Sequence, residues 1–155
     1  MKKPEIAAVL CLCTALFCGC GNNQKSSESS SVSVSKSSAD GIDFDLTKMS
    51  STMVYSTVYS MITQPDDYEG KTVKVTGNFN VYHDDTTNKD YYAVLISDAT
   101  ACCQQGMEFD LGSGYKYPDD YPPENALITV TGTFGTYMEG TARYCQLEKA
   151  TLKRE

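Results

Sequence analysis

The chain has 155 residues, enough for one domain of ordinary size. Its 13 Lys and Arg residues face 20 Asp and Glu residues, which gives a formal net charge of −7 at pH 7. Because phosphate recognition needs a basic face, this balance argues against a nucleic-acid partner. The single His excludes metal sites built from several histidines.

The amino-terminal segment has the pattern of a bacterial lipoprotein signal peptide. Lys2 and Lys3 precede an apolar run over residues 6–17. A helix that spans the bilayer needs roughly 20 apolar residues, so this shorter run is typical of the core of a signal peptide. The stretch Leu16-Phe17-Cys18-Gly19-Cys20 resembles a lipobox, in which small residues precede the Cys that receives the lipid. The alternative is an ordinary signal peptide in which Cys20 has no such role.

We therefore expect residues 1–19 to be removed as a signal peptide and Cys20 to carry a lipid anchor, palmitate included. The anchor would hold the protein on the outer, extracytoplasmic face of the cell membrane. Residues 20–39 are expected to be the lipidated Cys and a tether, because nine residues of 21–39 are Ser and little apolar surface is present. A flexible chain of about 20 residues reaches roughly 25 Å. The folded domain is expected over residues 40–155.

The folded part begins with apolar residues at helical spacing, which predict one amphipathic helix before the strands. The stripe consists of Leu46, Met49, Met53, Val54, Val58, Met61 and Ile62. Asp45 or Thr47 is the expected cap, and Pro65 ends the helix after Gln64. We expect this stripe to pack on the core rather than to bind a ligand.

After the helix the apolar period changes to two, which predicts five strands. The alternating segments cover residues 72–81, 91–97, 107–111, 127–137 and 142–152. An internal echo links two of them, since Pro65-Asp66-Asp67-Tyr68 precedes Val75-Thr76-Gly77-Asn78-Phe79, and Pro118-Asp119-Asp120-Tyr121 precedes Val130-Thr131-Gly132-Thr133-Phe134. The echo predicts two equivalent strands of one barrel, each bent at its Gly.

These alternating strands with mid-strand glycines resemble the OB-fold, a five-stranded Greek-key barrel. The resemblance covers about residues 68–152 and implies a mainly β fold, with the preceding helix as a plug or lid. The run Tyr91-Tyr92-Ala93-Val94-Leu95-Ile96-Ser97-Asp98, followed by Cys102-Cys103 and Met107-Glu108-Phe109, resembles uncharacterised Firmicutes lipoproteins of OB type. The adjacent Cys pair is also similar to one in the extracytoplasmic domain of a permease subunit linked to metal handling.

Many OB-folds bind oligonucleotides on a basic, aromatic face. From Asp40 onward the chain has nine Lys and Arg residues and eighteen Asp and Glu residues, a balance of −9. Nucleic acid is therefore excluded as the ligand of such a face, and a carbohydrate or a peptide remains open. The candidate ligand-binding aromatics are Tyr82, Tyr92, Tyr137 and Tyr144. Tyrosines are also ordinary strand residues, so a purely structural role is the alternative.

The cysteines of the folded part are the other candidate site. In the OB topology the third and fifth strands are parallel neighbours, so we expect Cys102, Cys103 and Cys145 at one end of the barrel. A disulfide from Cys145 to Cys103, or to Cys102 if Gly106 bulges the strand, would close a loop of about 42 residues. Such a bridge stabilises by on the order of 3–4 kcal/mol and suits an exported protein.

Two other states of these cysteines stay open. The three thiolates could bind Zn²⁺ or Cu⁺, with His83, Asp98 or water completing the shell. Alternatively, they remain buried or free thiols.

No Gly-rich phosphate loop, Ser nucleophile elbow or His-Glu-x-x-His pattern occurs in the sequence. We therefore expect a non-enzymatic binding or accessory module without a cofactor. Its expected partners are the membrane, through the lipid anchor, and an envelope protein, a transporter or a small ligand. The alternative is a metal-handling lipoprotein, with Zn as cofactor, or a thiol-redox lipoprotein, either of which would use Cys102, Cys103 and Cys145.

The lipobox assignment predicts the behaviour of Cys20→Ala. Without the thiol that receives the lipid, the precursor should incorporate no labelled fatty acid and should remain uncleaved by the lipoprotein peptidase. Fatty-acid labelling and mass spectrometry of the membrane fraction measure both effects. A correctly cleaved Cys20→Ala product that stays on the membrane would contradict the assignment.

Overall fold

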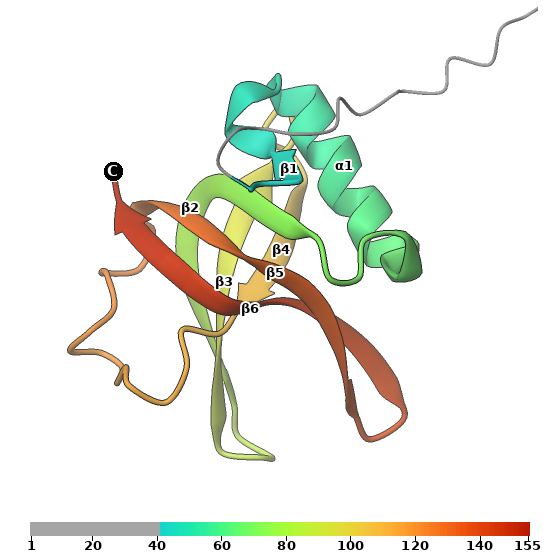
Figure 1. Ribbon diagram of the computed structural model, residues 1–155. Coiled ribbons are helices and arrows are strands. Elements are labelled where there is room, and N and C mark those ends of the chain that lie inside the picture. The colour runs from blue at the N-terminus through green and yellow to red at the C-terminus, as the bar shows by residue number, and fades with distance from the viewer. Residues whose placement is uncertain (1–40) are drawn as a thin grey trace, which may run out of the picture. The chain divides into compact units, whose positions relative to one another are not determined.

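The structure is a computed structural model that describes residues 41–155. The predicted signal peptide, the lipidation site Cys20 and the tether lie outside these residues. The strands are β1 (Phe44–Asp45), β2 (Thr72–Asp84), β3 (Lys89–Ser97), β4 (Gln104–Phe109), β5 (Leu127–Glu139) and β6 (Ala142–Arg154). The helices are α1 (Ser51–Thr63) and two 3₁₀ turns, η1 (Leu46–Lys48) and η2 (Pro65–Asp67) (Figure 1).

The strands close into a barrel. Their order is β1-β2-β3-β4-β6-β5, and β2 pairs with β5 as well, so β2 to β6 form a closed ring. The pair β4–β6 is parallel, whereas β2–β3, β3–β4, β5–β6 and β2–β5 are antiparallel. This confirms the predicted fold class, a mainly β, five-stranded OB-type barrel preceded by one helix.

The core lies inside the barrel and under α1. Inward-facing residues alternate along each strand, as the period of two predicts. Those with the least exposure are Val73, Val75, Phe79, Val94, Met107, Ile128, Val130, Phe134 and Leu147. Val58 and Met61 of α1 are also fully buried, so the helix is part of the core. Within residues 41–155, no helix has both the length and the apolar character needed to cross a membrane.

The predicted helix is shorter than its apolar stripe. Asp45 caps η1, where its side chain accepts a hydrogen bond from the Thr47 N–H at 3.2 Å. The chain is extended at Ser50 before α1 begins at Ser51, and α1 ends at Thr63, before Pro65. Ser and Thr are weak helix formers, so tertiary packing decides where the helix starts. Met53 falls outside the buried face, with 45% of its surface exposed.

The internal echo reflects a local symmetry, because β2 and β5 pair with each other. In the first copy, the Tyr68 ring lies 6.1 Å from the Phe134 ring. In the second copy, the Tyr121 ring lies 5.8 Å from the Phe79 ring. Each turn therefore packs its Tyr against the Phe of the other copy's strand, as expected for two equivalent strands of one barrel.

Gly77 allows a close approach between β2 and β3. A Cβ there would collide with the carbonyl oxygen of Leu95 and lie 2.8 Å from Cγ2 of Val94. Gly106 on β4 differs, because its nearest neighbour would be Cδ2 of Leu95 at an ordinary 3.5 Å.

The variant Gly77→Ala should therefore lower the free energy of unfolding by about 1–3 kcal/mol, because the backbone must shift to admit the methyl group. Gly106→Ala is the matched control and should leave stability unchanged or raise it by up to about 1 kcal/mol. Urea unfolding of the two variants measures the difference. Equal stabilities would show that the close approach at Gly77 is absent.

Candidate functional site

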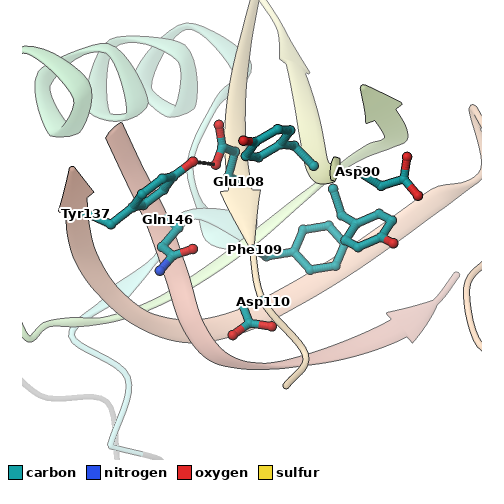
Figure 2. Close-up of a pocket in the computed structure, with 8 residues that line it drawn as sticks. Asp90, Glu108, Phe109, Asp110, Tyr137 and Gln146 are labelled. Carbon is teal, nitrogen blue, oxygen red and sulfur yellow. Dashed lines mark hydrogen bonds between the residues drawn. The ribbon is translucent and has the colours of Figure 1, made fainter. Parts of the chain in front are cut away.

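A groove crosses the outer surface of β3, β4 and β6 and is bordered by the β2–β3 and β5–β6 hairpins. It consists of two adjoining pockets of about 400 Å³ and about 170 Å³ that share Tyr91, Glu108 and Tyr137. The larger pocket is also lined by Asp90, Tyr92, Phe109, Asp110 and Gln146 (Figure 2). The smaller one is also lined by Tyr82, Asp84, Glu139 and Tyr144.

Strand register places the charged floor of this groove. Met107 and Phe109 point into the core, so Glu108 between them points outward. Glu108 is paired in the sheet with Gln146 of β6, which faces the same pocket. The outward phase of β4 and β6 therefore builds the floor.

The two hairpins form the walls of the groove, and their side chains contact each other. The Tyr91 hydroxyl donates a hydrogen bond to Glu139 at 2.7 Å, and Lys89 Nζ lies 3.0 Å from the same carboxylate. The Tyr137 and Tyr144 rings stack with centroids 5.5 Å apart. Aromatic rings and an ion pair thus hold both walls in one arrangement.

Among the carboxylates that line the groove, Glu108 is the one whose pKa burial affects most. The Tyr137 hydroxyl donates a hydrogen bond to its Oε2 at 2.7 Å (Figure 2). Burial raises the pKa of Glu108 above its usual range, although the Tyr137 hydrogen bond acts in the opposite direction. Burial and this same carboxylate raise the pKa of Tyr137, so the phenol keeps its proton and remains a donor at neutral pH.

The groove is strongly acidic. Asp90, Glu108 and Asp110 line the larger pocket, and no Lys or Arg is among its lining residues. Two bases of the β2–β3 hairpin have carboxylate partners, since Lys89 pairs with Glu139 and His83 Nδ1 lies 2.7 Å from Asp90. The hydrogen bond with Asp90 raises the pKa of His83. A cation that entered the larger pocket would meet Glu108 and Asp110, neither of which forms an ion pair within residues 41–155.

The structure brings the four tyrosines of the sequence analysis to this groove. Tyr82, Tyr137 and Tyr144 line the smaller pocket, and Tyr92 lines the larger one. The carboxylates of the groove, Glu108 above all, were not among the residues predicted from the sequence. A signal was present in its position between two inward-facing residues of a strand, but a charged residue there is typical of a solvent-facing surface as well.

The structure separates the predicted cysteine cluster. Cys102 and Cys103 lie together in the β3–β4 loop, whereas Cys145 lies on β6 with its Sγ 4.0 Å from the Met61 carbonyl. All three are free thiols, so the predicted Cys103–Cys145 disulfide is absent. The register of the parallel β4–β6 pair explains this separation. Glu108 pairs with Gln146, so Cys145 lies beside Met107 rather than beside Cys103. At about 3.3 Å per residue, Cys103 lies about 13 Å further along the strand.

The structure also separates the other two residues predicted as metal ligands, Asp98 and His83. Asp98 stays with Cys102 and Cys103. His83 pairs across the β2–β3 hairpin with Asp90, which lies at the other end of β3 from Asp98. Burial raises the pKa of the Cys145 thiol, so this Cys is protonated at neutral pH. A single site that contains Cys145 or His83 together with the pair is excluded in this structure.

Comparison with family models, with curated proteins and with solved structures found no match. A barrel of this type serves many unrelated functions, so the fold alone does not indicate a ligand. The feature of this barrel that bears on a ligand is its acidic groove with tyrosine walls.

The contact between Tyr137 and Glu108 predicts a pKa change that can be measured. The variant Tyr137→Phe removes the one hydrogen bond that stabilises the Glu108 carboxylate, so its already raised pKa should rise further. Carbon-13 NMR titration of the Glu108 carboxyl group gives the value, and Tyr144→Phe is the control. An unchanged or lower Glu108 pKa in Tyr137→Phe would contradict the described contact.

Proposed function

We propose that this chain is a lipid-anchored, non-enzymatic binding module that presents its groove outside the cell and holds a positively charged peptide segment. The observation that carries the proposal is the lining of the larger pocket, which combines Asp90, Glu108 and Asp110 with tyrosine rings and has no Lys or Arg. The source of the segment would be an envelope protein or a transporter at the membrane to which Cys20 anchors the chain.

The position of the groove supports a binding role. OB-folds bind their ligands on the face of the second and third barrel strands, between the first and last hairpin loops. In this barrel those strands are β3 and β4, and those hairpins are β2–β3 and β5–β6. The groove lies on that face, and its acidic lining disfavours an oligonucleotide.

The chemistry of the lining supports a basic peptide. Lys and Arg side chains can pair with the carboxylates, and their charged groups can lie over tyrosine faces, a contact worth about 0.5–2 kcal/mol. Glu108 is half-buried, so its attraction for a cation is screened less than that of an exposed carboxylate.

Synthetic hexapeptides test the proposal. A lysine-rich hexapeptide should bind at least about tenfold more tightly than a glutamate-rich one, and its affinity should fall as salt is added. Calorimetry measures both affinities, and tyrosine fluorescence reports the same event because the chain has no Trp.

A double variant locates the binding. Glu108→Gln with Asp110→Asn should weaken the lysine-rich peptide at least about tenfold, an effect of about 1.4 kcal/mol. The control Glu124→Gln removes an exposed carboxylate outside the groove lining and should have no effect. Binding of a neutral oligosaccharide in preference to both peptides would overturn the proposed ligand class, and equal losses in both variants would overturn the site.

A further inference from the structure

The β3–β4 loop gathers three possible metal ligands at one point. Cys102 Sγ lies 3.6 Å from Cys103 Sγ and 3.3 Å from Asp98 Oδ2. One ligand atom of each residue lies within 4.8 Å of the other two. We propose that these three residues, here named the dithiol loop, form a site for a thiophilic divalent cation, with Zn²⁺ as the ion that fits best. The site is separate from the groove and does not depend on the proposed function.

Local backbone geometry holds the dithiol loop in this arrangement. The Asp98 N–H donates to the Cys103 carbonyl at 2.9 Å, and Ala101 adopts the left-handed conformation that folds the chain back. Asp98 Oδ1 accepts hydrogen bonds from the N–H groups of Thr100 and Cys102 at 3.1 Å and 3.0 Å. One carboxylate oxygen thus fixes the loop, and the other, Oδ2, faces the Cys102 sulfur.

The separations match a tetrahedral zinc shell. Zn–S bonds of about 2.3 Å at tetrahedral angles place two sulfurs about 3.8 Å apart, and a Zn–O bond of about 2.1 Å places the oxygen about 3.6 Å from each sulfur. The observed distances, 3.6 Å between the sulfurs and 3.3 Å from Cys102 Sγ to Asp98 Oδ2, differ from these edges by a few tenths of an ångström. The third edge, from Cys103 Sγ to the Asp98 carboxylate, is within 4.8 Å. The ion can therefore enter after side-chain rotations that also turn the Thr100 hydroxyl away from Cys102 Sγ, from which it lies 3.0 Å.

The donor set selects among ions. Two sulfurs disfavour Ca²⁺ and Mg²⁺, which take oxygen ligands. Cu⁺ selects soft sulfur ligands and would leave the Asp98 oxygen unused, whereas Zn²⁺ accepts thiolate and carboxylate in one shell. Three protein ligands leave the fourth tetrahedral position to water, and both cysteines are exposed. The site is thus suited to an ion that exchanges with solution or with a ligand of a partner.

Zinc affinity of the full chain, reduced with a phosphine, tests this site by competition with a chromophoric chelator. The wild-type chain should bind one more equivalent of Zn²⁺ than the variant Cys102→Ser/Cys103→Ser. Asp98→Asn should weaken that equivalent by about tenfold or more, because even partners outside a ligand shell typically contribute about 10–100-fold. Cys145→Ser removes one thiol away from the loop and is the matched control. The N-terminal cysteines are present in all variants, so a difference in zinc binding between variants comes from the dithiol loop.

Co²⁺ in place of Zn²⁺ gives a second measurement on the unmutated chain. A thiolate-to-cobalt charge-transfer band with the visible bands of tetrahedral cobalt is expected, and its intensity should fall in Cys102→Ser/Cys103→Ser by the contribution of one site. Equal zinc stoichiometry and affinity in the wild type and the double Cys variant would overturn the proposal. Loss of the ion in Cys145→Ser would overturn the assignment to these three residues, and absence of the charge-transfer band in the wild type would exclude thiolate ligation.

Discussion

The pairing of β2 with β5 is the constraint on which the rest of the structure depends. It closes the sheet into a ring, so that Val75 and Val130, which are paired in its register, become fully buried. Both strands extend beyond the residues that pair with each other. The extension of β2 forms a hairpin with β3, and that of β5 forms a hairpin with β6. Closure of the barrel and the positions of both groove walls therefore follow from one antiparallel contact.

The same geometry explains why the groove is acidic without harm to the fold. Glu108 stands on the outer phase of β4, whose inner phase is the core, so packing does not depend on its carboxylate. Glu108 becomes half-buried at the place where the Tyr137 hydroxyl contacts it. Burial then gives that residue a raised pKa and a strong response to an approaching cation.

The barrel could be predicted from the sequence because a period of two along a strand directly reports which residues face inward. The echo around Gly77 and Gly132 also predicted two equivalent strands, since turn and strand residues repeat together. Register could not be predicted in this way, because the alternation is preserved when one parallel strand slides two residues past another. Cys145 was therefore misplaced relative to Cys103. Glu108 was missed because its burial comes from hairpins distant in sequence.

The pH dependence of basic-peptide binding tests the central claim, that the half-buried carboxylate of the groove attracts a cation, most directly. Glu108 attracts a cation only when ionised, and its pKa lies above that of an ordinary Glu. The affinity of the lysine-rich hexapeptide should therefore fall as the pH is lowered through the raised pKa of Glu108, before ordinary carboxylates titrate. This fall should be smaller in Glu108→Gln, in which the protonation of His83 beside Asp90 remains as the other contribution. The same pH profile in the wild type and in Glu108→Gln would contradict the account.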